Sequence, residues 1–215
     1  MRKKTSRGEE TRARINQATL QIIKRDGMRS VRHRAVAKEA EVPLGATTYH
    51  FHNIEDLIVS AFSQWREETN VGSNPYISQL MEFLEHRAPG LPDTEEGRIT
   101  MAREVYRVTL AYEIDQIEGG WDNRVIELAF YHESLHSEKL RQQVIAYWQL
   151  ELDSLITVFT ALRLPDPVAD ARISQSVFHQ LEREAMIKGV DYDRAILEST
   201  LHRHICHLMG VEFTP

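Results

Sequence analysis

The segment His132-Glu133-Ser134-Leu135-His136 has the residue types and the spacing of a zinc-hydrolase motif. On a helix, histidines four residues apart share a face and can bind one zinc ion, while the glutamate acts as a general base. A hydrolase of this kind also requires a third ligand and a cleft, commonly beside a sheet edge, and the sequence shows no strand pattern. Because the chain has ten histidines, the spacing is weak evidence. Zinc hydrolysis is kept as an alternative function.

A second group of possible metal ligands lies near the C-terminus. It consists of His202, His204, Cys206 and His207, and two of these, His202 and Cys206, are four residues apart on one helical face. The group would suit a metal- or redox-sensing regulator. It would equally suit the polar flank of a last helix, with the cysteine as a small buried residue. Since Cys206 is the only cysteine, no intrachain disulfide can form, which agrees with a reducing cytoplasm.

The elements that must position these residues are predicted to be helices throughout, so we expect an all-α fold. Apolar residues recur with the 3.6-residue period, and proline and glycine mark the breaks between segments. No apolar run approaches the roughly 20 residues of a membrane span, and the basic start lacks the apolar core of a secretory signal. The predicted helices cover about 11–26, 32–40, 44–51, 53–65, 74–87, 98–118, 121–135, 137–162, 167–188 and 192–209.

Charge is distributed unevenly along the chain. Residues 1–53 hold twelve Lys and Arg against five Asp and Glu, a net of +7, whereas the remainder carries −13, which together give the total of −6. Clustered positive charge favours binding to phosphates through counterion release, whatever the sign of the total. Taken alone, this charge distribution could also belong to a charged surface that only contacts solvent.

The basic segment contains two short predicted helices joined by a tight turn at Pro43, which is the pattern of a helix-turn-helix. In this motif the second helix enters the major groove of DNA. Its small and hydroxyl-bearing residues permit close approach and contacts to bases or phosphates. It has no Arg, Asn or Gln for bidentate base readout, so we expect recognition to depend on phosphate contacts and DNA shape. The helix contributes Leu44, Gly45, Ala46, Thr47, Thr48, Tyr49 and His50.

The same segment resembles the DNA-binding region of the tetracycline-repressor (TetR) family. The resemblance rests on Ala37-x-x-Ala40-x-Val42-x-x-Gly45, then Tyr49-His50-Phe51 and Glu55-x-Leu57, and with the preceding helix it covers about a quarter of the chain. It implies a core of Val36, Ala40, Val42, Phe51 and Leu57. It also implies that a set of residues faces DNA: Arg34, Pro43, Gly45, Ala46, Thr48, Tyr49 and His50.

Other residues of the basic segment are added to the expected DNA contacts. Arg32 begins the first short helix, and the amides after Asn53 can hold a phosphate. The arm that contains Arg2, Lys3 and Lys4 can reach along the backbone or into a minor groove; a solvated tail is the alternative. Two positions depart from the family pattern, because Thr48 stands where a tyrosine is frequent and Ile54 where a lysine is frequent.

The rest of the chain is expected to bind an effector and to form a homodimer. The long helices 137–162 and 167–188 could pair across a twofold axis, and we expect the interface to include Leu152, Leu155, Phe159, Phe178, Leu181 and Ala185. Packing inside one monomer is the alternative. A mostly apolar pocket for an uncharged or weakly acidic organic effector is expected among Met101, Tyr106, Leu110, Trp121, Phe130, Trp148, Phe178 and His179.

Together these patterns predict a cytoplasmic, ligand-responsive transcriptional repressor rather than an enzyme, with no cofactor. The expected division places DNA binding in residues 1–55 and effector binding and dimerisation in residues 56–215. The dimer would bind a near-palindromic double-stranded DNA operator and leave it when a small organic effector binds.

Overall fold

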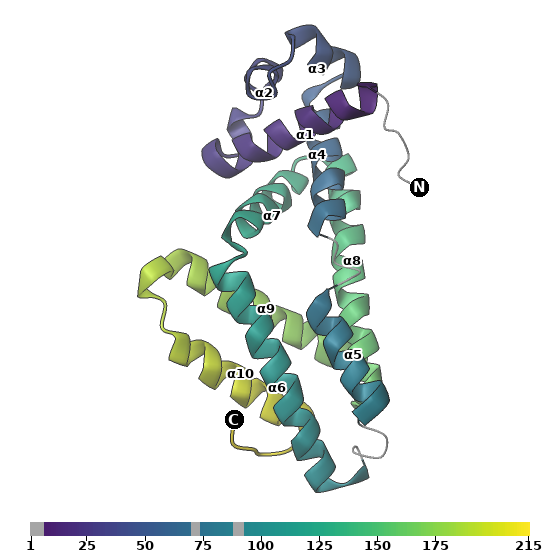
Figure 1. The fold of residues 1–215 in the computed structure, drawn as a ribbon, viewed down its shortest axis with the longest axis vertical. Coiled ribbons are helices and arrows are strands. Elements are labelled where there is room, and N and C mark those ends of the chain that lie inside the picture. The colour runs from purple at the N-terminus through teal and green to yellow at the C-terminus, as the bar shows by residue number, and fades with distance from the viewer. Residues whose placement is uncertain (1–6, 70–73, 88–92) are drawn as a thin grey trace. The chain divides into compact units, whose positions relative to one another are not determined.

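The computed structural model describes residues 7–69, 74–87 and 93–215, and every regular element within these ranges is helical (Figure 1). The predicted all-α fold is therefore confirmed. The elements are α1 (Arg7–Asp26), η1 (Met28–Ser30), α2 (His33–Glu39), α3 (Leu44–His50), α4 (Ile54–Thr69), α5 (Pro75–Arg87), α6 (Glu95–Glu118), α7 (Trp121–Ser134), α8 (Glu138–Ala161), α9 (Pro167–Lys188), η4 (Gly189–Asp191) and α10 (Arg194–Met209). Among the described residues, no helix is long and apolar enough to cross a bilayer.

The chain divides into two compact units. Unit 1 comprises residues 1–70 and 122–148, and unit 2 comprises residues 71–121 and 149–215. The structural division thus differs from the predicted functional boundary at residue 55, because α4, most of α7 and the first part of α8 belong to the same unit as the basic segment. The assignment of DNA binding and effector binding to the two parts stays a prediction.

Unit 1 is built around α1 and α4, which pack against each other. Helix α1 buries one face, including Ile15, Ile22 and Ile23, because its apolar residues recur at helical spacing. Four aromatic rings continue the core from α4 into α7 and α8. Phe62 meets Phe130 edge-on at 5.1 Å between centroids, and Trp65 lies 5.5 Å from Tyr147. Each such pair adds about 0.5–1.5 kcal/mol beyond its buried area.

Polar contacts also join the later helices of unit 1 to α1 and α4. Lys24 pairs with Asp122, and Lys139 Nζ lies 2.8 Å from Asp56 Oδ1. The Ser137 hydroxyl donates to Glu55 Oε1 at 2.5 Å. Since Glu55 and Asp56 are in the first turn of α4, these contacts hold α8 against the helix that directly follows the helix-turn-helix.

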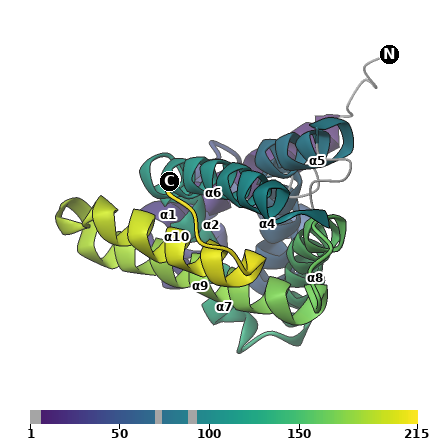
Figure 2. The same cartoon turned by 90° about the horizontal axis from the view of Figure 1, so that it is seen from below.

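Unit 2 has its own apolar core, to which α6 and α10 contribute most and to which α8 and α9 also contribute. Helix α10 packs on α6 and α9, and Figures 1 and 2 both show α9 and α10 side by side. Side-chain caps fix the starts of all three helices. Thr94 accepts from the amide of Gly97, Asp166 from that of Ala169 and Asp193 from that of Ala195. Each cap replaces a hydrogen bond that the helix itself cannot make.

Four of the six predicted dimer-interface residues are instead core residues of this chain. Leu152, Phe159 and Leu181 are each no more than 4 % exposed and pack within the core of unit 2. Ala185 is also only 4 % exposed. The prediction was wrong for these four, because the apolar stripes of α8 and α9 face their own monomer. Leu155 and Phe178 are half-buried against the same core.

Candidate nucleic-acid interface

Helices α2 and α3 form the predicted helix-turn-helix, joined by residues 40–43. Within the turn, the amide of Val42 donates to the carbonyl of Ala37 at 3.0 Å. Arg14 of α1 donates from Nη2 to the carbonyl of Ala40 at 2.7 Å, which satisfies a carbonyl left open at the end of α2. Glu41 adopts a left-handed conformation with φ of 53°, which lets the chain reverse before Pro43.

Thr47 holds the two helices together and does not face DNA. Its side chain is fully buried, its hydroxyl donates to the carbonyl of Leu44 at 2.8 Å, and Oγ1 lies 3.3 Å from Nδ1 of His33 on α2. The prediction of Thr47 as a DNA contact was therefore wrong. On a helix as short as α3 one face must pack on α2, and Thr47 is on that face.

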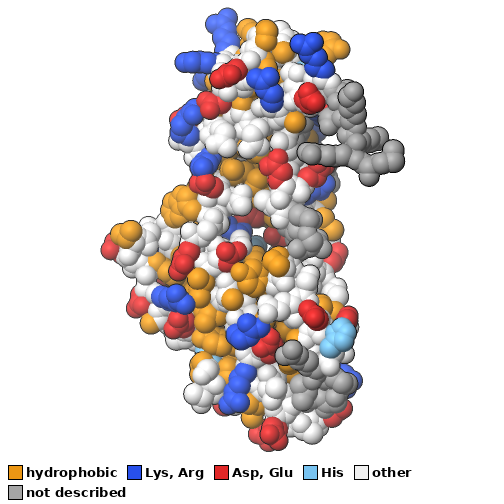
Figure 3. Space-filling model, viewed as in Figure 1, with side chains coloured by type: hydrophobic (Ala, Val, Ile, Leu, Met, Phe, Trp, Pro, Cys, Tyr) orange, Lys and Arg blue, Asp and Glu red, His pale blue; other side chains and the backbone are white. Residues whose placement is uncertain are grey.

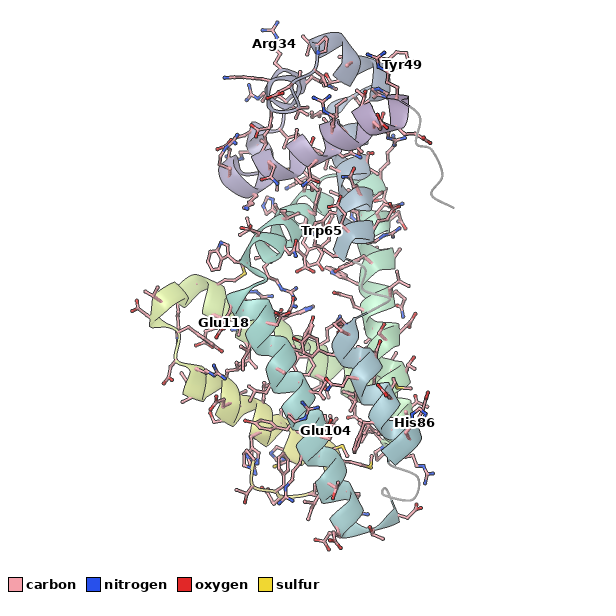
Figure 4. All side chains as sticks on the ribbon, viewed as in Figure 1. Arg34, Tyr49, Trp65, His86, Glu104 and Glu118 are labelled. Carbon is pink, nitrogen blue, oxygen red and sulfur yellow. The ribbon has the colours of Figure 1, made fainter. Side chains whose placement is uncertain are left out.

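The other face of α3 is open to solvent. Tyr49 is 84 % exposed and Leu44 42 %, and the side chain of Thr48 is also exposed. Figure 4 shows Tyr49 on α3 and Arg34 on α2 projecting away from the helices, and Arg34 is exposed. The ring of Tyr49 is therefore accessible to a second molecule.

Gly45 is in the same exposed face, and the fold itself does not require a glycine there. A Cβ atom at this position would meet no atom within 4 Å, and no positive φ is recorded for it. A glycine inside a helix costs about 0.5–1 kcal/mol relative to alanine. A small residue at a site with open space suits the close approach of a second molecule to the helix.

The remaining predicted contacts surround this face. Arg32 and Pro43 are exposed, and Ala46 and His50 are half-buried. Asn53 caps α4 by accepting a hydrogen bond from the amide of Asp56 at 2.8 Å. Figure 3 shows Lys and Arg side chains over the α1–α3 segment in the displayed face. The arm residues Arg2, Lys3 and Lys4 lie outside the described residues.

Sequence reasoning missed a polar hollow beside α3. Its volume is about 550 Å³, and it is lined by residues of α1, α3, α4 and the intervening loop, among them Arg12, Tyr49, His52 and Ser60. Arg12 places its guanidinium 5.4 Å from the centre of the Phe51 ring and donates to Ser60 Oγ. The periodicity of α1 identifies only its buried apolar face, so Arg12 carried no distinguishing signal.

The predicted effector-pocket residues fall in both units. Met101, Tyr106, Leu110, Phe178 and His179 belong to unit 2, where Met101 is fully buried and Tyr106 is 8 % exposed. Trp121 belongs to unit 2 and Trp148 to unit 1, and both are nearly half exposed. Phe130 lies in the aromatic core of unit 1. Their assignment to one pocket stays a prediction.

In the C-terminal histidine–cysteine group, His202 of α10 packs against Phe213, which follows that helix. His202 Nε2 lies 2.7 Å from the carbonyl oxygen of Phe213, and its ring meets the Phe213 ring at 4.6 Å. Cys206 is buried, and burial raises the pKa of its thiol, which keeps it protonated and a poor ligand. Among the described residues, no group of three His, Cys, Asp or Glu could hold a metal ion.

His132 and His136 do lie side by side. Helix α7 ends at Ser134, and a tight turn with His136 N donating to Glu133 O at 2.9 Å brings the second ring beside the first. The ring centroids are 5.6 Å apart, and both side chains are exposed. The pair lacks the third protein ligand, within the described ranges, that a zinc hydrolase requires.

No protein-family model and no curated protein sequence matches the chain. Solved structures do match it over nearly its whole length. A transcriptional regulator from Rhodococcus sp. RHA1 shares 18% identity with a TM-score of 0.67, covering 95% of this chain and 99% of its own. A TetR-family member from Streptomyces coelicolor A3 shares 24% identity with a TM-score of 0.59, covering 91% and 98%.

The multidrug binding protein EbrR, in complex with imidazole, shares 25% identity with a TM-score of 0.55, covering 94% of this chain and 97% of its own. The likeness therefore includes unit 2, for which the sequence offered only length and helical layout. The chain has the fold of the TetR-family transcriptional regulators, the family that its helix-turn-helix segment resembles.

Proposed function

We propose that the protein is a ligand-responsive transcriptional repressor that binds double-stranded DNA through α3. The observation that carries this proposal is the solvent-facing side of α3, where Gly45 has open space above it and Tyr49 is 84 % exposed. The net charge of +7 over residues 1–53 supports binding to the phosphate backbone.

The direct experiment is a fluorescence-anisotropy titration of the protein with labelled duplexes from the region upstream of its own gene. We expect saturable binding that weakens steeply between about 50 and 200 mM salt, as counterion release requires. Tyr49→Ala should weaken binding, while the control Val190→Ala changes a fully exposed side chain of unit 2 and should not. Salt-insensitive binding, or equal effects of both variants, would contradict the proposal.

We also propose that the protein acts as a homodimer, with an interface different from the one predicted from the stripes of α8 and α9. Support comes from apolar side chains that the fold of unit 2 leaves in water on these helices: Leu150, Val168, Ile173 and Ile187. Burial of the part of each that is still exposed would contribute up to about 1.5–3 kcal/mol. Ile173→Glu should shift the sedimentation coefficient toward that of a monomer, whereas Val190→Glu should leave it unchanged.

The proposed effector is an organic cation with aromatic rings. Two carboxylates are buried in unit 2, those of Glu113 on α6 and Glu182 on α9, which are 0 % and 4 % exposed. Both residues have interaction partners within the protein. Where they are ionised, they attract a cationic effector that comes near them and repel an acidic one. The uncharged or weakly acidic class expected from the sequence stays the alternative that the experiment below distinguishes. EbrR, the fold relative, has been crystallised with proflavin, ethidium and malachite green.

Ethidium fluorescence tests the effector class without DNA. We expect binding by the wild-type protein and a loss of about tenfold or more in affinity for Glu113→Gln, since about 1.4 kcal/mol corresponds to a factor of ten. Glu104→Gln is the matched control, because Glu104 is on the same helix in an ion pair with Arg107. An effector released by the wild-type protein on denaturation and found to be an anion would overturn this assignment.

A further inference from the structure

The histidine pair at the end of α7 is not used by any function proposed above. We propose that His132 and His136 form a two-histidine site for a divalent transition-metal ion, with the remaining coordination positions taken by water. The observation behind it is the distance of 5.6 Å between the two exposed imidazole rings.

That distance fits a shared ion. Zinc–nitrogen bonds are about 2.0–2.1 Å long, and the centre of a coordinated imidazole lies roughly 1 Å beyond its nitrogen, so two rings at a tetrahedral angle have centroids about 5–5.5 Å apart. The observed separation of 5.6 Å is close to that value, so the two rings are near enough to share one ion. Imidazole nitrogen selects zinc, copper and nickel over magnesium and calcium, which prefer oxygen ligands.

Hydrogen bonds from Arg141 and Ser137 stabilise the turn after α7 that brings the two rings together. Arg141 donates to the carbonyls of Ser134 and Leu135, and Ser137 is bonded to Glu55 at the start of α4. The Arg141 charge opposes a cation nearby, although its ion pair with Glu138 at 2.7 Å offsets part of that repulsion. An ion bound here restrains the same turn, so its binding energy adds to the stability of unit 1.

The site has no third protein ligand among the described residues, which separates it from a hydrolytic zinc centre. Two ligands give an open and exchangeable site, whose occupancy follows the free metal concentration. The proposal does not depend on DNA binding, and it makes the metal a stabilising ligand of unit 1.

Isothermal titration calorimetry with zinc chloride, and separately nickel chloride, tests the site on the full chain. We expect one ion per chain, and an affinity lower by on the order of tenfold or more in both His132→Ala and His136→Ala, since even loss of a residue that only supports a ligand costs about 10–100-fold. His86→Ala is the control, because His86 is an exposed histidine on α5 in unit 2 (Figure 4). Magnesium chloride should give no heat of binding.

A thermal-shift measurement supplies a second readout that does not rely on heats. At about a hundredfold excess of zinc over Kd, Tm should rise by about 5 °C or more in the wild-type protein and in His86→Ala, and by less than half of that in either site variant. Equal zinc binding by wild type and the double variant His132→Ala/His136→Ala would overturn the proposal. So would loss of binding in His86→Ala alone.

Discussion

The guanidinium of Arg12 lies over the ring of Phe51, 5.4 Å from its centre, and donates to Ser60 Oγ at 3.1 Å from Nη2. The side chain of Arg12, on α1, therefore contacts both Phe51, the residue after the end of α3, and Ser60 on α4. Asn16 donates to the same Ser60 hydroxyl at 3.0 Å. The position of α3 on the rest of unit 1 depends on this group of contacts.

Replacement of Arg12 should therefore loosen the end of α3. We expect Arg12→Gln to lower the free energy of unfolding by about 1 kcal/mol, because a cation–π contact at the surface and a hydrogen bond to a hydroxyl are each of about this size. Urea unfolding monitored by circular dichroism measures it. Arg29→Gln removes an exposed arginine near α1 and should change stability by less than about 0.5 kcal/mol. Equal effects of the two variants would refute the role of Arg12.

Thr47 and Tyr49 are two residues apart and should respond oppositely to substitution. Thr47→Val removes the hydrogen bonds of a buried hydroxyl and should destabilise the fold by about 1 kcal/mol. Tyr49→Ala should leave stability within about 0.5 kcal/mol of wild type, because the ring is in water, and should weaken DNA binding severalfold or more. Unfolding and anisotropy titrations on both variants check the contrast. A Tyr49→Ala variant that is strongly destabilised would contradict the exposed position.

Glu41 offers a test of the turn itself. Its φ of 53° is unfavourable for a residue with a side chain but neutral for glycine. Glu41→Gly should be neutral or stabilising, by up to about 1 kcal/mol, whereas Glu41→Val should destabilise, because a β-branched residue resists the left-handed region. Thermal unfolding compares the two. A Glu41→Val protein as stable as Glu41→Gly would show that the turn is not left-handed in solution.

The sequence was sufficient for the order of the helices and for many of their boundaries, because proline, glycine and capping residues mark them locally. It placed the start of α1 four residues late and the end of α4 four residues early, where no such residue marks the boundary. Asp166 and Pro167, for example, predict the start of α9, and the structure shows the cap. Local pattern did not reveal which neighbour each apolar stripe faces. Leu152 and Leu181 are on genuine stripes, but a stripe that meets the core of its own chain has the same periodicity as one that meets a second copy.

Local pattern also could not show which side of α3 packs against the rest of unit 1. Thr47 and Thr48 are identical in type and adjacent, so residue chemistry alone assigned both to DNA. Helical geometry separates their directions by about 100° per residue, and only the position of α2 determines which of them is buried. The hollow beside Arg12 is formed by segments far apart in the sequence, and no local signal could have shown it.

Arg34 should contribute charge rather than sequence readout. It is exposed on α2 and projects from the helix-turn-helix (Figure 4). If it neutralises one phosphate, Arg34→Gln should reduce the slope of log K against log salt concentration by about 0.9. It should weaken binding to all sequences alike. Anisotropy titrations at four salt concentrations, on the upstream duplex and on a scrambled one, give the slopes. An unchanged slope would place Arg34 away from the backbone.

His204 links stability to pH in unit 2. Its Nε2 lies 2.8 Å from the Ser174 hydroxyl oxygen, and burial lowers the pKa of the imidazole, with His207 lowering it further and Asp170 opposing. Because the unfolded chain then binds the proton more tightly than the folded one, this group contributes stability that is complete above the ordinary histidine pKa of about 6.5. The contribution is lost as the pH falls from that value toward the lower pKa of the folded state.

Urea unfolding at a series of pH values from 8 down to 5 should show this loss in the wild-type protein. His204→Gln keeps a hydrogen-bonding group beside Ser174 but cannot be protonated, so its stability should fall less over the same range. His86→Gln replaces an exposed histidine on α5 and should follow the wild-type curve. Wild type and His204→Gln differ only in that imidazole, so the difference between their curves isolates His204. Parallel curves for wild type and His204→Gln would mean that protonation of this imidazole is not coupled to folding.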